Sequence, residues 1–251
     1  MASEADPSAE TSMVLVVGGT GALGAAVAKL LTKRGLATVA TYSGAPPDPG
    51  LVPGTRWVRF DAAAPDTAAN ITAAVAAAGL PLTCVVYAAG IPSSRLPLAA
   101  TPLAELAELF SVNAQGLVAM WQSVAPVARR SGTSLVVISS QAARTLSAGS
   151  GPYSASKAAL EALALTLAEE EAAHDVRVNV IAPSLISSPM ADRISARTRG
   201  NHLPWGKALE LAEVAEAAVA LGCDSTWRYL SGQVLQLDAP ITPSPDAVEV
   251  P

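Results

Sequence analysis

The feature that most limits the possible folds lies near the start of the chain. It is an apolar segment followed by a glycine-rich turn and then by a helix. Residues 13–17 are all apolar, and residues 22–33 have the composition of a helix. Glycine between a strand and a helix lets the backbone turn sharply and approach a phosphate, which the free amides of the helix N-terminus stabilise. We therefore expect a pyrophosphate-binding turn rather than a simple glycine-rich turn, formed by Gly18, Gly19, Thr20, Gly21, Leu23 and Gly24.

The alternation of short apolar runs and helical segments continues along the chain. Strands are predicted at 13–17, 37–41, 56–60, 82–88, 134–139, 177–181 and 233–237, and helices at 22–33, 70–78, 102–128, 153–173 and 212–221. Parallel strands need crossover connections, which are usually helical. The pattern predicts an α/β fold of the Rossmann type, a doubly wound parallel sheet of about seven strands with helices on both faces.

The segments that do not follow this alternation of strands and helices indicate the domain organisation. We expect a flexible leader over 1–12, a single oxidoreductase domain over 13–239 and a flexible, proline-containing tail over 240–251. Residues 187–206 follow a strand at the carboxyl edge of the sheet, where such sheets bind ligands. A lid over the substrate is one interpretation of this segment, and an ordinary loop with a short helix is the other.

Charge and composition exclude several classes of partner. The net charge of the 251 residues is −5 and the chain has no basic stripe, which argues against binding to nucleic acid. There is no run of about 18 apolar residues as a membrane-spanning helix requires, and the acidic residues 1–12 do not resemble a secretory signal. The two cysteines and two histidines are isolated, so we expect no metal site. A cytoplasmic location is predicted.

Tyr153 and Lys157 are the strongest candidates for chemistry. Their spacing of four places them on one face of a helix. A tyrosine has a pKa of about 10 in water, and an adjacent ammonium lowers it, which makes the phenol a usable proton donor or acceptor. Such a pair alone is usually a coincidence of surface composition. Ser140, however, ends a strand 13 residues upstream, where a hydroxyl can hydrogen-bond a substrate oxygen.

Taken together, these features resemble the short-chain dehydrogenase/reductase family, in particular its free-standing 3-oxoacyl-carrier-protein-reductase-like ketoreductases. The resemblance covers residues 14–238, and the features occur in the family's order: the glycine turn, Asp61, the sequence Tyr87-Ala88-Ala89-Gly90, Asn113, Ser140, Tyr153 with Lys157, and residues 183–188. It implies that Asn113, Ser140, Tyr153 and Lys157 are catalytic, with Asn113 bending its helix and holding a water that relays protons through Lys157.

The resemblance also implies which residues hold the cofactor. Asp61 would bind the adenine amino group, Ile186 and Ser188 would contact the nicotinamide amide, and the remaining contacts would come from Ala62, Ala88, Ala89, Gly90, Tyr153, Lys157 and Pro183. The chain departs from the family pattern at Val17, Ala22, Tyr87, Ala88, Ser184 and the pair Ala239-Pro240. Modular polyketide-synthase ketoreductase domains share the glycine run, but they place their lysine elsewhere.

The choice between the two nicotinamide cofactors depends on the end of the second strand. NAD-selective dehydrogenases usually place a carboxylate there to hold the adenosine ribose. This chain has Tyr42 and Ser43 instead, which removes the repulsion of a 2′-phosphate and favours NADP(H) over NAD(H), although no arginine stands beside them in the sequence.

We therefore expect an NADPH-dependent reduction of a ketone or other carbonyl to an alcohol, in secondary-metabolite or fatty-acyl metabolism, with Tyr153 as general acid. The alternatives are an NAD-dependent alcohol dehydrogenase and a non-catalytic, cofactor-sensing protein. The expected partners are a small-molecule substrate and further copies of the chain in a homodimer or homotetramer, as the resemblance implies. The residues expected around the substrate are Arg144, Leu146, Met190 and Trp205, and those that would meet an anionic group are Arg193, Arg197 and Arg199.

Overall fold

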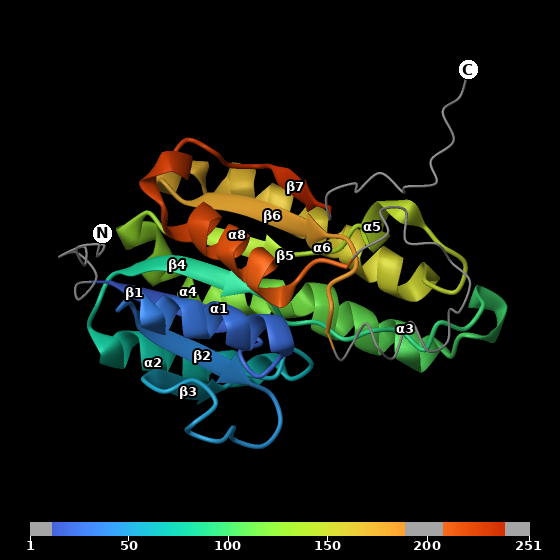
Figure 1. Cartoon of the computed structure of the whole chain (residues 1–251), viewed down its shortest axis with the longest axis horizontal. Helices are drawn as coiled ribbons and strands as arrows, with labels where there is room; N and C mark the ends of the chain where they lie inside the picture. The colour runs from blue at the N-terminus through green and yellow to red at the C-terminus, as the bar shows by residue number, and fades with distance from the viewer. Residues whose placement is uncertain (1–11, 189–207, 239–251) are drawn as a thin grey trace, which may run out of the picture.

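Seven parallel strands form one sheet in the order β3-β2-β1-β4-β5-β6-β7 (Figure 1). The computed structural model describes residues 12–188 and 208–238. The strands are β1 Met13–Val17, β2 Ala37–Tyr42, β3 Thr55–Arg59, β4 Leu82–Tyr87, β5 Ser134–Ile138, β6 Arg177–Pro183 and β7 Val234–Leu237. The doubly wound α/β fold predicted from the sequence is confirmed, and each strand lies within two residues of its expected bounds.

Two apolar cores cover the two faces of this sheet. Successive side chains of a strand point to opposite faces, so Val14 and Val16 pack with α1 (Ala22–Lys33) and α8 (Leu211–Cys223), whereas Leu15 and Val17 pack on the other side. The second core is closed by α2 (Ala69–Ala78), α4 (Gly116–Ser131) and α6 (Gly151–Glu170). Figure 1 shows α1 and α8 side by side in front of the sheet and α6 behind it. Because all strands point the same way, their carboxyl ends and the turns that follow them form one edge.

The long helix expected over 102–128 is interrupted. It consists of α3 (Leu103–Phe110), a π-helical turn (η4, Ser111–Gln115) and α4. Two smaller differences concern α6, which begins two residues before Tyr153, and α5 (Ala142–Thr145), a helical turn that the sequence did not indicate. The remaining short helices are η2 Pro65–Ala68, η3 Leu98–Ala100, η5 Ala172–His174 and η6 Ser225–Trp227.

Several of the predicted segments and site residues lie outside the residues that the structure describes. The tail, nearly all of the leader and most of the segment interpreted as a lid lie outside the described residues, together with Met190, Arg193, Arg197, Arg199 and Trp205. Within the described ranges, no helix is long and apolar enough to cross a membrane.

Candidate active site

The glycine turn between β1 and α1 is packed so tightly that its glycines leave no room for larger side chains. A Cβ atom at Gly24 would lie 2.1 Å from the carbonyl oxygen of Gly18, and Gly18 itself has a φ of 83°. The turn is tied to β2, because the Gly18 amide donates to Thr41 Oγ1 at 3.0 Å and the Gly19 amide to the Thr41 carbonyl at 2.9 Å. The first turn of α1 carries no acidic residue. Its amides therefore remain available for an anion, as the pyrophosphate of a dinucleotide requires.

A cavity of about 400 Å³ connects this turn with the predicted catalytic residues. Among the predicted residues, its lining includes Thr20, Gly21, Leu23, Gly24, Ala88, Gly90, Tyr153, Lys157, Ile186 and Ser188. Its other lining residues, to which the sequence assigned no role in the site, are Ala22, Pro92, Ile138, Ser139 and Leu211. The cavity thus joins the phosphate-binding turn to the tyrosine and lysine of α6.

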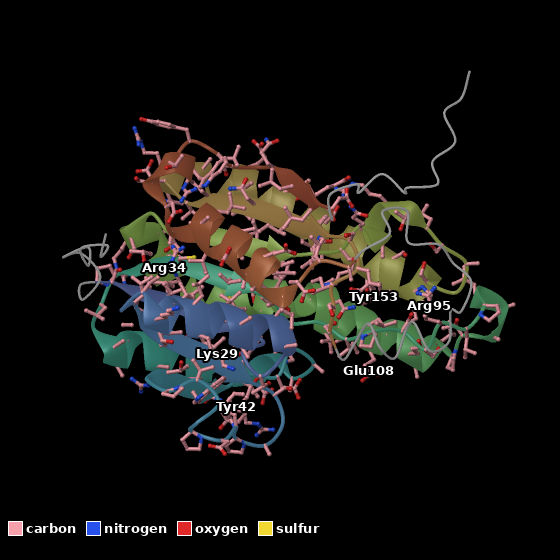
Figure 2. The ribbon with its side chains drawn as sticks, in the orientation of Figure 1. Lys29, Arg34, Tyr42, Arg95, Glu108 and Tyr153 are labelled. Carbon is pink, nitrogen blue, oxygen red and sulfur yellow. The ribbon has the colours of Figure 1, made fainter. Side chains whose placement is uncertain are left out.

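Of the residues expected on the adenosine side, Ala88 and Gly90 line this cavity, whereas Tyr42, Ser43, Asp61 and Ala62 do not. Figure 2 shows Tyr42 well separated from Tyr153, as expected for the two ends of an extended dinucleotide. Tyr42 is half-buried and Ser43 is exposed. The Asp61 carboxylate accepts a hydrogen bond from the Ala63 amide at 2.9 Å, and Ala62 is buried in the core.

Trp57 lies against the glycine turn, a contact that the sequence did not indicate. A Cβ atom at Gly19 would meet the indole ring at 2.9 Å. The indole N–H is buried and has no hydrogen-bond partner within the described part of the chain. Trp57 therefore forms a wall beside the turn, with an unused donor.

Tyr153 and Lys157 line the other end of the cavity, and Ser140 and Asn113 lie next to them. Ser140 lies close enough to Tyr153 to lower the pKa of its phenol, and the Lys157 ammonium lies 6.0 Å from the centre of the Tyr153 ring. Lys157 is 4% exposed and donates to the Ile138 carbonyl at 3.1 Å. Both Lys157 and Asn113 border Gly90, where an added Cβ would lie 3.2 Å from Lys157 Nζ and 3.3 Å from Asn113 Oδ1. The structure therefore brings all four predicted catalytic residues to one place.

Burial decides the protonation states of Tyr153 and Lys157. It raises the pKa of Tyr153, although the hydrogen bond with Ser140 lowers it in part. It also lowers the pKa of Lys157 to about 8, against the attraction of Glu161. We expected the ammonium to lower the pKa of Tyr153, but in this structure desolvation has the larger effect. The phenol is consequently protonated at neutral pH.

Asn113 is held by the π-helical turn that interrupts the helix. Its side chain accepts from the Ile91 amide at 2.7 Å and donates to the Ile91 carbonyl at 3.1 Å and to Ser156 Oγ at 3.0 Å. Tyr87 Oη donates to the Val112 carbonyl, which lies in this π-helical turn, at 3.2 Å. Tyr87 thereby supports the turn that carries Asn113.

The strands around the site are joined at their carboxyl ends. The Gln141 amide donates to the Pro183 carbonyl at 3.0 Å, which ties the segment of Ser140 to the end of β6. Ile186 forms a bridge with Leu209, and the flanking amides of Ser187 and Leu209 pair with the carbonyls of Leu209 and Leu185, each at 2.8 Å. Residues 183–188 are thereby fixed beside the cavity.

Two residues that we expected to surround the substrate, Arg144 and Leu146, lie elsewhere in the structure. Arg144 forms an ion pair with Glu161, and neither residue lines the cavity. Leu146 is 71% exposed.

Comparison with known proteins identifies the family. A family model described as enoyl-(acyl carrier protein) reductase matches residues 19–242. The chain belongs to the short-chain dehydrogenase/reductase family and is a nicotinamide-cofactor-dependent oxidoreductase. The tight glycine turn, the free helix amides and the converging catalytic side chains fit such a cofactor.

Individual relatives span the chain to different extents. It is 29% identical over 240 residues to cis-4-hydroxycyclohexanecarboxylate dehydrogenase of Sinomonas cyclohexanicum, covering 92% of this chain and 96% of that protein. It is 32% identical over 135 residues to 3-oxoacyl-[acyl-carrier-protein] reductase FabG of Thermotoga maritima, covering 52% of this chain and only 54% of that protein. A solved short-chain dehydrogenase/reductase of Mycobacterium ulcerans superposes with a TM-score of 0.80 at 26% identity, over 90% of this chain and 88% of the other.

Proposed function

We propose that this protein reduces a ketone or other carbonyl to an alcohol with NADPH, and that Tyr153 is the general acid. The observation that carries the proposal is Tyr153 beside Lys157 in the cavity that begins at the glycine turn, with Ser140 close enough to Tyr153 to lower the pKa of its phenol. A phenol whose pKa is raised holds its proton at neutral pH. This state suits proton donation, which carbonyl reduction requires.

The proposed mechanism divides the work among four side chains. A nicotinamide held beside these residues would supply the hydride that the carbonyl carbon needs. Ser140 donates a hydrogen bond to the carbonyl oxygen and polarises it, and Tyr153 delivers the proton to the same oxygen. Lys157, together with Asn113, returns a proton to Tyr153. The lysine is well suited to this step, because a pKa of about 8 leaves it charged at neutral pH but able to release a proton.

The preference for NADPH is supported by the side chains at the carboxyl ends of β2 and β3. Tyr42 is paired with Arg59 across the two strands, so their side chains lie on the same face. Two residues earlier on the same face, Trp57 is paired with Ala40 and touches the glycine turn. Arg59 is exposed, and within the described residues no ion pair occupies it. This guanidinium is therefore available to hold a 2′-phosphate.

Replacing this arginine tests the cofactor preference. The Arg59→Ala variant is expected to raise KM for NADPH roughly tenfold, the order of one charge-assisted hydrogen bond, and to leave KM for NADH unchanged. Arg56→Ala is the matched control, because Arg56 lies on β3 one residue from Trp57 and therefore on the opposite face. Equal effects of the two variants, or equal effects on the two cofactors, would contradict this role of Arg59.

The reaction itself is tested with a panel of substrates. Purified protein is assayed for NADPH consumption with acyclic β-keto thioesters and cyclic ketones, and for NAD⁺ reduction with the corresponding alcohols. We expect turnover of at least one ketone with NADPH. Faster turnover in the NAD⁺-dependent direction would instead identify an alcohol dehydrogenase. Cofactor binding without any turnover would support a cofactor-sensing protein.

The proposal also covers the cellular location and the oligomeric state of the enzyme. We propose a cytoplasmic location and a homodimer or homotetramer, as the family resemblance implies. Sedimentation velocity of the purified chain tests the assembly, and a monomer at micromolar concentration would contradict it.

A further inference from the structure

A buried carboxylate lies one helical turn beyond Lys157. Tyr153, Lys157 and Glu161 follow one another at intervals of four residues, so they form a row along one face of α6. Glu161 is 7% exposed and does not line the cavity. A buried carboxylate has to be compensated by hydrogen bonds or charges, and the partners of Glu161 show what it holds in place.

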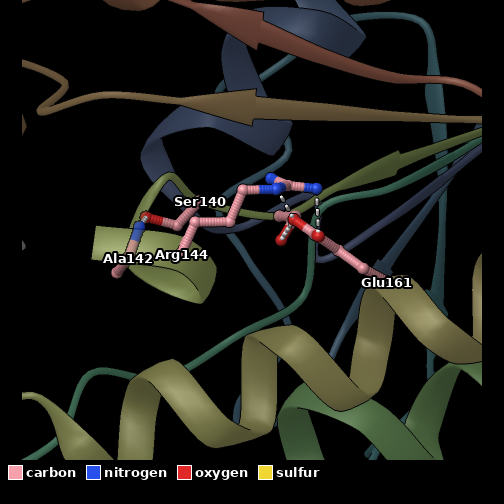
Figure 3. Close-up of polar contacts among 5 residues, drawn as sticks. Ser140, Ala142, Arg144 and Glu161 are labelled. Atoms are coloured by element: carbon pink, nitrogen blue, oxygen red, sulfur yellow. Dashed lines mark hydrogen bonds and ion pairs between the residues drawn. The ribbon is translucent and has the colours of Figure 1, made fainter. Parts of the chain in front are cut away.

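Two segments next to the catalytic serine are attached to Glu161. Ser139 Oγ donates to Glu161 Oε1 at 2.7 Å, and this serine directly precedes Ser140. Arg144 contributes two bonds, at 2.6 Å to Oε2 and 3.3 Å to Oε1. Figure 3 shows the guanidinium of Arg144 facing the carboxylate, with Ser140 on the segment that leads to α5. Glu161 therefore binds the chain on both sides of Ser140 to the helix that carries Tyr153.

The same carboxylate balances the charges of the site. Lys157 and Arg144 are two cations that share Glu161 as an anion. Of the other ionisable groups near this region, Tyr153 is on the same helix and Glu105 of α3 accepts two bonds from Ser94. Glu108 of α3 is exposed, and Asp238 beyond β7 is exposed and accepts a hydrogen bond from Gln141. The charge on Lys157 therefore depends on the balance between Glu161 and Arg144.

We propose that Glu161, held by Arg144 and Ser139, is a positioning residue that keeps Lys157 charged and places Ser140 against Tyr153. The proposal rests on the function proposed above, because it concerns how the same four residues are prepared for proton transfer. Glu161 does not touch the cavity and acts only through its neighbours.

The electrostatic part of this role separates it from a purely structural ion pair. Glu161→Gln removes the anion and leaves two cations, so the pKa of Lys157 should fall. Arg144→Gln removes a cation and leaves Glu161 with a single cationic partner, so the same pKa should rise. Both variants break the same ion pair, and a structural clamp alone would make them behave alike. Opposite shifts are therefore the signature of the proposed role.

The experiment is a pH titration of Lys157 in the cofactor-free protein, followed by NMR of lysine labelled with ¹³C at Cε and assigned with Lys157→Met. The wild-type midpoint is expected at about 8. Glu161→Gln should lower it and Arg144→Gln should raise it, each by roughly one pH unit, whereas Arg144→Lys should restore the wild-type value. In turnover assays, Glu161→Gln should lower kcat with little change in KM for NADPH.

The chain provides a matched control at the other end of the fold. Glu171 is 2% exposed and is bound in the same two-pronged way by Arg129, at 2.7 and 2.8 Å, with Trp121 as a third partner. Glu171→Gln therefore breaks a similar buried pair and should leave the Lys157 midpoint unchanged.

Three outcomes decide the proposal. Opposite shifts support it, whereas shifts in the same direction, or no shift in either variant, overturn it. If Glu161→Gln does not fold, Arg144→Gln alone decides, because the side chain of Arg144 is 40% exposed and the predicted upward shift is specific to the charge balance. The titration needs neither substrate nor cofactor, so an absence of turnover in the wild-type protein would refute the proposed function without affecting this result.

Discussion

Replacing Lys157 with methionine should stabilise the cofactor-free protein, because the site holds a cation that the fold would otherwise exclude. Burial lowers the pKa of this ammonium from 10.5 to about 8. At about 1.4 kcal/mol per pH unit, this shift is a cost of about 3 kcal/mol at neutral pH. The variant also loses the hydrogen bond to the Ile138 carbonyl, which contributes about 1 kcal/mol. A net gain of about 2 kcal/mol remains, or a rise in Tm of roughly 4–8 °C for a chain of this length.

The stability difference should depend on pH in a defined direction. Between the folded pKa of about 8 and the unfolded value of 10.5, the unfolded wild-type chain binds more protons than the folded one. Wild-type stability therefore rises with pH in this interval, and the advantage of Lys157→Met shrinks from its full value below pH 8.

Urea unfolding at pH 7 and at pH 9.5, at equal protein concentration, measures both effects. Lys29→Met, a substitution at a surface position of α1, is the control and should change stability by less than about 0.5 kcal/mol. A Lys157→Met variant that is less stable than the wild type at pH 7, or a gain that grows with pH, would refute the reasoning.

Two further substitutions test the backbone segments that support the site, the glycine turn and the π-helical turn. Gly24→Ala should raise the dissociation constant of NADPH at least tenfold and lower stability by about 1–3 kcal/mol, since its Cβ would lie 2.1 Å from the Gly18 carbonyl oxygen. Fluorescence titration and urea unfolding measure these two effects. The control is Gly44→Ala, which has open space around it and should show neither effect. Tyr87→Phe removes only the hydroxyl that supports the Val112 carbonyl, so unfolding should show a loss of about 1 kcal/mol and assays a lower kcat, whereas an unchanged kcat would contradict a role for this bond in placing Asn113.

Much of the fold could be predicted because the information is local. Strands such as β4 and β5 are continuous apolar runs, as expected for a parallel sheet covered on both faces, and the glycine turn marks the first crossover. The order of these elements places Ser140 and Tyr153 at one edge of the sheet. Spacing along the chain therefore predicts that the two residues meet, and in the structure Ser140 lies close enough to Tyr153 to lower the pKa of its phenol.

The remaining features depend on contacts between distant segments. The π-helical turn at Asn113 is supported by Tyr87, 25 residues away in the preceding strand, and no local pattern in the helix indicates it. In the sequence, Glu161 is one of several acidic residues on a helix, and only its burial against Ser139 and Arg144 distinguishes it. Likewise, no local pattern in the sequence places Arg59 next to Tyr42, because only the pairing of β2 with β3 brings the two residues together.

The central claim, that Tyr153 donates the proton in a carbonyl reduction, is tested most directly by comparing NADPH binding and turnover in Tyr153→Phe. The substitution removes the hydroxyl and keeps the ring, so the dissociation constant of NADPH should stay within about threefold of the wild-type value. The turnover rate of the best ketone from the panel should fall by roughly 10² to 10⁴, the usual contribution of general acid catalysis. Turnover near the wild-type rate, with NADPH still bound, would contradict the mechanism.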